Sequence, residues 1–399
     1  MMKKNWIIWF SVLVGVVVLG GVAFVLFHAP NETSKTESSS EISDVGEDQE
    51  QEESTTQQTA DERAVEIPTE KPTSPVIYAT VFTHNEDGLG IEDPDYTQDE
   101  DEFWTDREAV IEFAQMLQDH HVGYDFQSDW NFLLAIQAFD EGTDSTDGKN
   151  VLRYLSEDLD AQVDIHSHQN MGYNTADVGY LMTQLGVTPS GIVGGMIASP
   201  AEDSLLEDFW EPMKANKFDY TWSAEAVFGG GTGLHQDEES LWTSGVWRPQ
   251  DKEHYLVHDD DAPIPSIGHY ESNWDGLDNL LAHQEAGDLE AGKMYTIAIN
   301  AHQRDFNEAF KNEFEAQLKT YDDETQEGRI VWVTLNEVLD IWHTTYNEEP
   351  TIFKFDGEAS STTDAPTLQP GGTGTGGSCG NGVCEALERK MKLCPEDCS

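Results

Sequence analysis

The sequence predicts an α/β fold with the architecture of a (β/α) barrel. Apolar runs with β character alternate with amphipathic helical patterns across residues 75–348, which is the pattern of a parallel sheet with helices outside it. The length of this region favours a closed barrel over an open sheet. An apolar segment precedes the region and a cysteine cluster follows it, so we expect one large domain with an extension at each end.

The predicted domain opens with a strand and a helix. The apolar run "PVIYATVFT" at residues 75–83 is typical of a short β-strand. Residues 105–123 then carry an apolar stripe at helical spacing, and Thr105 with Glu108 predicts a capping box at the start of this helix.

The later elements repeat the same alternation. The segment from residue 220 to 275 is rich in Gly, Trp and Asp and supports no assignment. Thr334 and Glu337 predict a second capping box. Strands are expected at 161–166, 190–198, 293–302 and 328–333, and helices at 174–187, 204–217, 305–321 and 334–346.

The N-terminal part of the chain predicts a membrane anchor and a stalk. Residues 6–27 contain no charged side chain and are long enough to span the hydrocarbon core, which takes about 20 residues. Lys3 and Lys4 precede them, so residues 1–5 are expected in the cytoplasm and the bulk of the chain outside, at the cell surface. A signal peptide cleaved near Ala23 is the alternative. Residues 28–74 are polar and acidic and predict a disordered linker.

The C-terminal part predicts a flexible linker at residues 349–378 and a cysteine-rich module at 379–399. An even number of clustered cysteines is typical of a disulfide-bonded module outside the reducing cytoplasm. A zinc knuckle is the alternative, although the spacing lacks the C-x2-C pairs of common zinc sites. The four cysteines are Cys379, Cys384, Cys394 and Cys398.

The charge of the chain excludes one class of partner. Asp and Glu number 77 against 21 Lys and Arg, which gives a formal net charge of −56. A surface of this sign repels phosphate, so we expect no nucleic-acid partner.

Polar residues that suit catalysis follow three predicted strands. His84, Glu86 and Asp87 follow the first strand, "VDIHSHQN" ends the strand at 161–166, and His302 ends the strand at 293–302. The active sites of (β/α) barrels lie at the carboxyl ends of the strands. We therefore expect these residues to gather at one mouth. The acidic run "HDDD" at 258–261 is expected to be a solvated loop rather than a second metal site.

The segment "AQVDIHSHQN" places two histidines on one face of a strand. Side chains alternate along a strand, so Asp164, His166 and His168 share one face while Val163 and Ile165 share the other. Ionisable groups inside a barrel are costly unless they are paired or coordinate a metal. The alternative is that the strand ends at Ile165 and leaves both histidines in a solvated loop.

Four segments, "FTHNEDG", "DIHSHQNMG", "IAINAHQRD" and "VWVTLNEVLDIW", resemble in order the motifs of the polysaccharide deacetylase (NodB-homology) family. The resemblance covers Val76 to Tyr346 and implies a distorted (β/α) barrel that acts as a metal-dependent carbohydrate esterase. It implies that Glu86 takes a proton from water, that Asp87 binds the metal, and that His302 protonates the leaving group.

The second motif departs from the family pattern His-Ser/Thr-x-x-His. If His166 begins the motif, Asn170 stands where the second histidine belongs; if His168 begins it, Gly172 stands there. We therefore expect His166 and His168 both to bind a divalent ion, zinc above all, together with Asp87. His84 is an alternative ligand.

The cysteine-rich end resembles repeats of the form CGxGxCE…CPxDC at the ends of bacterial surface proteins. Asn381, Glu385 and Asp397 could offer oxygens to calcium there. The leading expectation is a membrane-anchored enzyme that removes acetyl groups from a polysaccharide. One alternative is a surface protein that binds glycan without catalysis. Another is a glycoside hydrolase, which needs two carboxylates across a cleft.

Overall fold

The computed structural model describes residue 68 and residues 70–85, 95–169, 171–195, 206–229 and 242–355. The predicted anchor at 6–27, most of the predicted linker at 28–74 and the cysteine module at 379–399 lie outside these ranges. In the described ranges, no helix is both long enough and apolar enough to cross a membrane.

A nine-stranded sheet forms the centre of the fold, and its pairings are parallel except for the edge pair β10–β9. The predicted α/β fold with a parallel sheet is thereby confirmed. In spatial order the strands are β11 (Met294–Asn300), β1 (Val76–Asn85), β2 (Tyr124–Ser128), β3 (Gln162–Ser167), β4 (Ile192–Gly195), β7 (Ala226–Gly229), β10 (Ser266–Ile267) and β9 (Val246–Trp247), while β12 (Ile330–Trp332) also pairs with β1.

The sheet curves until backbone beyond β10 meets β11. The Ala298 N–H on β11 donates to the His269 carbonyl at 3.0 Å. The Thr296 hydroxyl lies 2.9 Å from the Gly268 carbonyl and 3.2 Å from that of Gly245. These bonds join the two sides of the sheet, so the carboxyl ends of the parallel strands surround one opening, the mouth.

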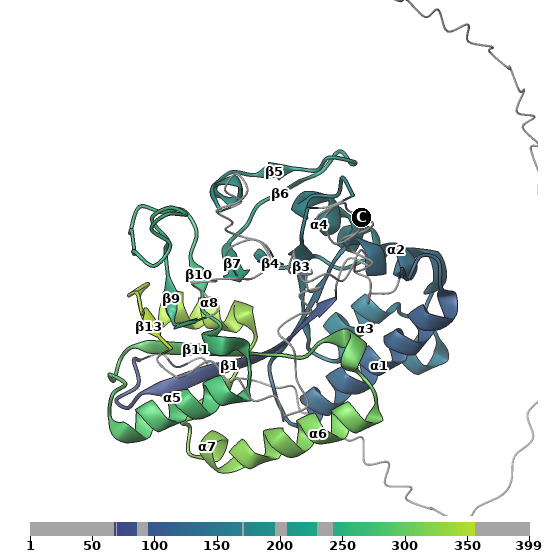
Figure 1. Ribbon diagram of the computed structural model, residues 1–399. Coiled ribbons are helices and arrows are strands. Elements are labelled where there is room, and N and C mark those ends of the chain that lie inside the picture. Colours follow the sequence, from purple (N-terminus) through teal and green to yellow (C-terminus); the bar gives the residue numbers. More distant parts are fainter. Residues whose placement is uncertain are drawn as a thin grey trace, which may run out of the picture. The chain divides into compact units, whose positions relative to one another are not determined.

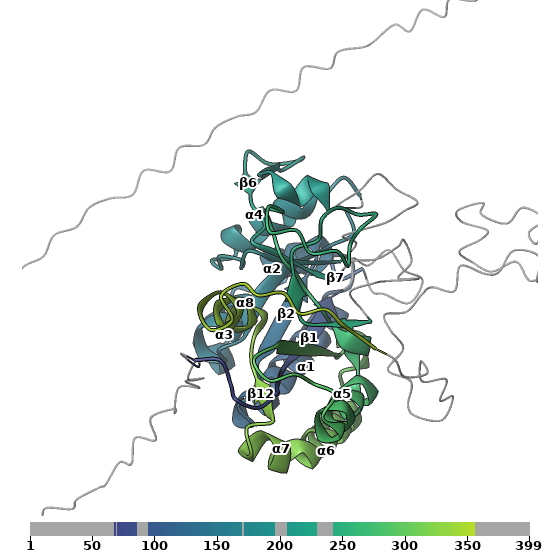
Figure 2. The same ribbon diagram turned by 90° about the vertical axis from the view of Figure 1, so that its left-hand side faces the viewer.

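Helices cover the outer face of the sheet (Figure 1), where a large apolar core contains alternate strand residues such as Val81, Val163 and Ile165. Figure 2 shows α5, α6 and α7 together on one side of the strands. The outer helices are α1 (Glu100–Asp119), α2 (Trp130–Phe139), α3 (Val151–Asp158), α4 (Thr175–Gln184), α5 (Trp274–Ala286), α6 (Glu308–Leu318) and α7 (Asp322–Gln326).

Helix α8 (Leu335–Thr344) belongs to a separate core formed with the inner face of the sheet. Its apolar side packs with residues such as Tyr78 and Phe228. At its N-terminus, the Leu335 N–H donates to the Asp125 carboxylate at 3.2 Å and the Asn336 N–H donates to Gln162 Oε1 at 2.8 Å. Asp125 and Gln162 lie near the starts of β2 and β3, so the N-terminus of α8 contacts the amino ends of these strands. Helix α8 therefore does not cover their carboxyl ends, where the predicted site residues lie.

Two predicted helices need correction. Helix α1 starts at Glu100 with Asp99 as its N-cap, so Thr105 does not cap it; the Thr105 hydroxyl instead donates to the Asp101 carbonyl within the helix. The predicted helix at 204–217 is wrong. A 3-10 turn at Glu207–Trp210 gives way to β5 (Met213–Lys214), which pairs with β6 (Thr221–Trp222). Proline at position 212 explains the change, since it cannot continue a helix.

The other capping box is confirmed, because Thr334 caps α8 and Glu337 closes the box. The fold also extends beyond residue 348. Strand β13 (Phe353–Lys354) pairs with β8 (Thr243–Ser244), so the first residues assigned to the C-terminal linker belong to the domain. At the other boundary, Lys71 forms an ion pair with Glu349, so the end of the predicted stalk also contacts the domain.

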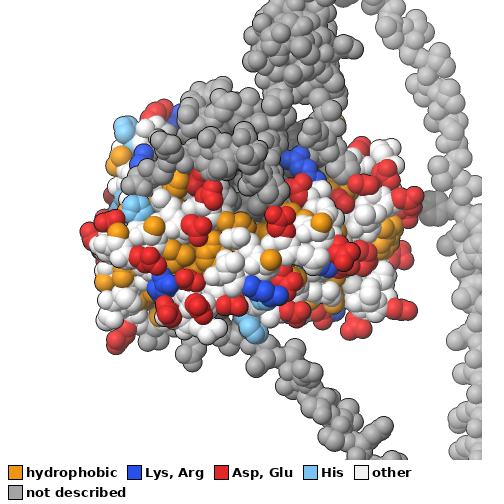
Figure 3. Space-filling view, turned by 60° about the horizontal axis from the view of Figure 1, so that its bottom comes forward, with side chains coloured by type: hydrophobic (Ala, Val, Ile, Leu, Met, Phe, Trp, Pro, Cys, Tyr) orange, Lys and Arg blue, Asp and Glu red, His pale blue; other side chains and the backbone are white. Residues whose placement is uncertain are grey.

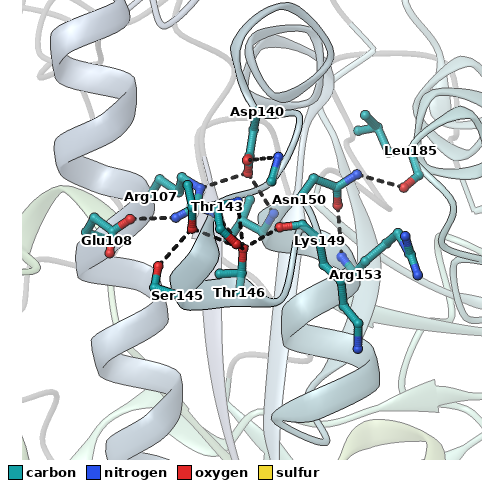
Figure 4. A network of polar contacts seen from close by, with 12 residues as sticks. Arg107, Glu108, Asp140, Thr143, Ser145, Thr146, Lys149, Asn150, Arg153 and Leu185 are labelled. Atoms are coloured by element: carbon teal, nitrogen blue, oxygen red, sulfur yellow. Dashed lines mark hydrogen bonds and ion pairs between the residues drawn. The ribbon is translucent and has the colours of Figure 1, made fainter. Parts of the chain in front are cut away.

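A buried arginine ties three outer elements together (Figure 4). The Arg107 Nε on α1 donates to Asp140 Oδ2 at 2.8 Å, and both side chains are fully buried. Asp140 also accepts the Val151 N–H at 2.7 Å, which fixes the start of α3. The guanidinium further contacts Thr146 on the connecting turn. This network joins α1, the end of α2 and the start of α3.

Candidate functional site

Three imidazoles meet at the carboxyl ends of β1 and β3. His166 is fully buried, and its Nε2 lies 2.9 Å from the Nε2 of His168. The His84 ring lies over the His166 ring, with centroids 4.0 Å apart and planes inclined by 32°. His84 is in register with Gln127 on β2, which is in register with Asp164 on β3. Parallel pairing therefore brings these side chains to one face of the sheet.

The predicted alternation along β3 is confirmed. Val163 and Ile165 lie in the core beneath the helices, while Asp164 and His166 occupy the opposite face of the same strand. The strand continues to Ser167, so the alternative in which it ends at Ile165 is wrong; His168, however, lies just beyond the strand and is partly exposed.

A layer of buried acids supports this face. The Asp164 carboxylate accepts hydrogen bonds from Gln162 Nε2 at 2.7 and 2.8 Å and from the Ser190 hydroxyl. Burial raises the pKa of Asp164 to about 6, although these hydrogen bonds oppose the rise. Asp125 lies beside it, and burial followed by the charge of Asp164 raises the pKa of Asp125 well above its usual range. One proton shared by the two carboxyl groups satisfies this arrangement.

Gly194 on β4 makes room for an amide in the same layer. A Cβ at Gly194 would lie 2.0 Å from Gln127 Oε1, so only glycine permits Gln127 to occupy this space. Gly194 belongs to the segment "GIVGG". Packing against Gln127 thus explains why glycine occupies this position, which the sequence pattern did not reveal.

A further histidine at the mouth, His269, was not predicted from the sequence. His269 follows β10, is 4 % exposed, and stacks on Phe228 with ring centroids 3.9 Å apart. Phe82 contacts both His269 and His84, at 5.7 and 4.8 Å between centroids. The available signal was a histidine two residues after the short run "PIPSI", but β10 has only two residues and leaves almost no periodicity.

The turn after His269 is strained. Tyr270, Glu271 and Ser272 have φ values of 52°, 72° and 55°, a left-handed conformation that costs non-glycine residues about 1–3 kcal/mol each. The Ser272 hydroxyl lies 3.0 Å from His269 Nδ1 and orients the ring. Backbone strain of this kind is concentrated at functional sites, where it holds particular side chains in position.

The structure places His302 at the carboxyl end of β11, the neighbour of β1. It is 2 % exposed, and its Nε2 lies 3.3 Å from Asn300 Nδ2. The next residue, Gln303, accepts a hydrogen bond from Asn85 at the end of β1 and donates one to the Tyr96 hydroxyl at 3.1 Å. His302 is therefore held at the same end of the sheet as the histidines of β1 and β3.

The spacing of the two imidazole nitrogens suits a shared metal ion. Two nitrogens bound to one tetrahedral zinc would lie roughly 3.3 Å apart, so the 2.9 Å between His166 and His168 suits two ligands of one ion after a small adjustment. Within the described residues, no group of three or more His, Cys, Asp or Glu side chains is arranged to hold a metal, and His84 completes no such set. Glu86, Asp87 and the four cysteines lie outside the described residues.

The acidic run at 258–261 and the neighbouring Arg248 lie in structural surroundings. In the loop at 258–261 the Asp260 side chain is 95 % exposed, whereas the His258 side chain is 16 % exposed and its Nδ1 accepts the Arg248 N–H at 3.1 Å. The Arg248 guanidinium donates to the Pro263 carbonyl at 3.0 Å and to Glu348 at 2.7 Å, so it joins this loop to the segment after α8.

No family model matches the chain. No curated protein matches it either. Among solved structures the chain is similar to the Puue allantoinase, with 11 % identity and a TM-score of 0.40 over 67 % of this chain and 91 % of that one. It is also similar to a probable polysaccharide deacetylase from Pseudomonas aeruginosa PAO1, with 12 % identity and a TM-score of 0.37 over 67 % of this chain and 91 % of that one. Likenesses of this size leave the function to be inferred from the site.

Proposed function

We propose that the protein is a metal-dependent hydrolase that removes acetyl groups from a polysaccharide. The observation that carries the proposal is the pair His166 and His168, whose Nε2 atoms lie 2.9 Å apart at the carboxyl end of β3. The order of the four sequence motifs, which resembles that of the polysaccharide deacetylase family, supports the same reading.

His166, His168 and Asp87 would hold the metal ion, with zinc as the ion that this donor set suits best. A divalent ion bound there would activate water and polarise the acetyl carbonyl. The protein fixes the histidine strand from below, because Asp164 on the same face is anchored to Gln162 and Ser190.

Two side chains would move the protons. Glu86 would accept a proton as water adds to the acetyl carbon. A histidine of the mouth would donate a proton to the leaving nitrogen or oxygen as its bond to that carbon breaks. His302 is the proposed donor from its place in the motif order, and His269 is a second histidine at the same end of the sheet.

The location of the protein remains a proposal from the sequence. We propose that residues 6–27 anchor the chain in a membrane and that the domain faces outward at the cell surface. We propose further that the four cysteines form disulfides and that their module binds calcium. Proteolysis of intact cells would release the domain if this orientation is right, and a domain accessible only after lysis would contradict it.

The central experiment measures bound metal and released acetate on the purified protein. His166→Ala and His168→Ala are each expected to lower the metal content from about one zinc per chain to near zero and to abolish acetate release from an acetylated glycan. His254→Ala is the matched control, because this histidine contacts Asp251 and its side chain is 56 % exposed. Unchanged metal content in both site variants would rule out the proposed ligands.

The second candidate is a glycan-binding protein without catalysis. It is favoured by the sequence at the second motif, where Asn170 or Gly172 occupies the position of the family's second histidine. Glycan binding that survives a chelator, with no acetate released at any metal concentration, would identify this candidate instead.

A further inference from the structure

We infer that the rim of the mouth beside β3 carries a subsite for a negatively charged sugar unit, centred on Lys217. The proposed reaction would then act on an acidic glycan. The part of this inference that concerns turnover rests on the proposed function, while the subsite itself rests on the surroundings of Lys217.

The Lys217 ammonium lies on a stack of two aromatic rings. Its Nζ is 4.1 Å from the centroid of the Tyr173 ring, and Tyr173 stacks on Trp130 with centroids 4.8 Å apart and planes inclined by 1°. A cation over an aromatic face is attracted by the electron density of the ring. The rings therefore hold the ammonium at a defined place.

The stack belongs to the end of the sheet that carries the histidines. Trp130 begins α2 directly after β2, and Tyr173 follows His168 by five positions in the connection from β3 to α4. Both rings therefore come from segments that leave the carboxyl ends of the strands. Lys217 reaches them from the turn between β5 and β6.

The backbone of this turn is clamped to α4. The buried Asp177 carboxylate accepts the Lys217 N–H at 2.7 Å and the Asn216 N–H at 3.0 Å. The Asn174 side chain donates to the Lys214 carbonyl at 2.8 Å. Lys217 is thus fixed at its backbone and at its ammonium, although the residue as a whole is exposed.

Within the described residues, no carboxylate forms an ion pair with Lys217. Other lysines of the same domain are paired, as Lys293 is with Glu349 and Lys311 with Glu112. The nearby Asp177 carboxylate is occupied by the backbone N–H groups of Asn216 and Lys217. Among the described residues, its ammonium N–H groups are therefore available to an anion from outside.

The loop beside the stack adds an apolar surface. Met171 has φ 49°, a left-handed conformation, and is 62 % exposed. Gly172, with φ 79°, brings the backbone close to the lysine, since a Cβ there would lie 3.6 Å from Nζ. An apolar side chain next to a fixed cation suits a sugar ring that carries a carboxylate or a phosphate.

The net charge explains why an anionic unit would need such a cation. A chain with a formal charge of −56 repels anions, and this repulsion is screened beyond about 8–10 Å at physiological salt. Charges near the subsite therefore decide whether an anion binds, and a neutral sugar would gain little from Lys217.

The test compares acidic and neutral substrates on the purified full-length protein. Lys217→Met keeps the aliphatic stem and removes the charge, whereas Lys217→Arg keeps the charge and the contact with Tyr173. With O-acetylated polygalacturonate, we expect Lys217→Met to raise KM about three- to tenfold, and Lys217→Arg to stay within about twofold of the wild type. With neutral acetylated xylan, both variants should match the wild type. Lys252→Met is the control, since Lys252 also lacks an ion pair within the described residues.

Equilibrium binding separates this inference from the proposed reaction. Oligogalacturonate without acetyl groups and glucose 6-phosphate are titrated into wild type and Lys217→Met, which distinguishes a carboxylate-bearing unit from a phosphate-bearing one. Weaker binding of either anion to the variant supports the subsite even if the wild type releases no acetate. Equal binding to both proteins overturns it. Equal losses with xylan and polygalacturonate, together with a lower midpoint of thermal unfolding, also overturn it, because they show that Lys217 acts only on stability.

Discussion

At the scale of single residues, Asp125 and Asp164 make the stability of the fold depend on pH. Both carboxyl groups are fully buried, and burial raises both pKa values. Below the pKa of an unfolded aspartate, about 3.9, both carboxyl groups are protonated in the folded and in the unfolded protein, so they do not lower the free energy of unfolding. As the pH rises, the two carboxyl groups lose their protons readily in the unfolded chain, whereas burial keeps them protonated in the folded protein. The free energy of unfolding should therefore fall from about pH 4 through pH 6, where Asp164 titrates, and further as Asp125 is forced to ionise.

Asp125→Asn should remove much of this loss. The amide oxygen can still accept the Leu335 N–H, and the amide nitrogen can donate to Asp164 without needing a proton. At pH 8 we expect the variant to be more stable than the wild type by about 1–3 kcal/mol, which is the typical desolvation penalty of a buried polar group. At pH 4 the two should be similar. Urea unfolding at both pH values measures this, with the exposed Asp340→Asn as control. An equal effect at both pH values would contradict the argument.

Gly194→Ala should disturb the interior by steric overlap with Gln127. The added methyl group would lie 2.0 Å from Gln127 Oε1, so the amide has to move within a packed layer. We expect a loss of about 1–3 kcal/mol in the free energy of unfolding, which is typical of overpacking. The change should cost much less in a Gln127→Ala background, where the space is open. A loss of the same size in both backgrounds would place the cause in the backbone and not in this contact.

At the scale of elements, the sequence predicts most long periodic segments well, apart from the helix expected at 204–217, and predicts short segments poorly. Helix α8 was predicted with its capping box because Thr334 and Glu337 are local signals. The start of α1 was misplaced, because an earlier N-cap, Asp99, precedes a Thr105–Glu108 spacing that also fits a capping box. Strand β10 was missed because two residues carry no period, and its stability comes from neighbours that are remote in sequence. His269, which depends on β10 for its position, was missed with it.

The Arg107 network links elements through one buried charge pair. Asp140→Ala would leave the Arg107 guanidinium buried without its main partner, which typically costs about 3–5 kcal/mol. Glu108→Ala is the matched control, because Glu108 contacts the same guanidinium but its side chain is 51 % exposed. We expect the control to lose less than about 1 kcal/mol. Chemical denaturation compares the two, and equal losses would show that burial does not set the strength of this pair.

At the scale of the whole molecule, the sequence predicted which strands carry the site residues, but it did not predict how far these residues lie from one another. Alternation along β3 placed His166 opposite Val163, since a parallel strand with helices on one side has an unambiguous inner face. How far His84 and His302 lie from this pair depends on the curvature of the sheet and on its closure at His269, which no local pattern encodes. The third metal ligand, proposed as Asp87, stays a prediction.

The charge of the molecule leads to a prediction about salt. Figure 3 shows acidic side chains spread over the visible face, with fewer basic ones among them. Raising NaCl from 0.01 to 1 M shortens the screening length from about 30 to about 3 Å and should weaken repulsion between these acids. It also weakens surface ion pairs such as those of Arg329 with Glu324 and Glu327, but such pairs contribute little individually. We therefore expect the midpoint of thermal unfolding to rise by about 5–10 °C, which corresponds to about 3–6 kcal/mol for a domain of roughly 275 residues. KCl should give the same rise as NaCl at equal concentration, because screening does not depend on the identity of the cation. A midpoint that falls with salt would show instead that the ion pairs outweigh the repulsion of the excess acids.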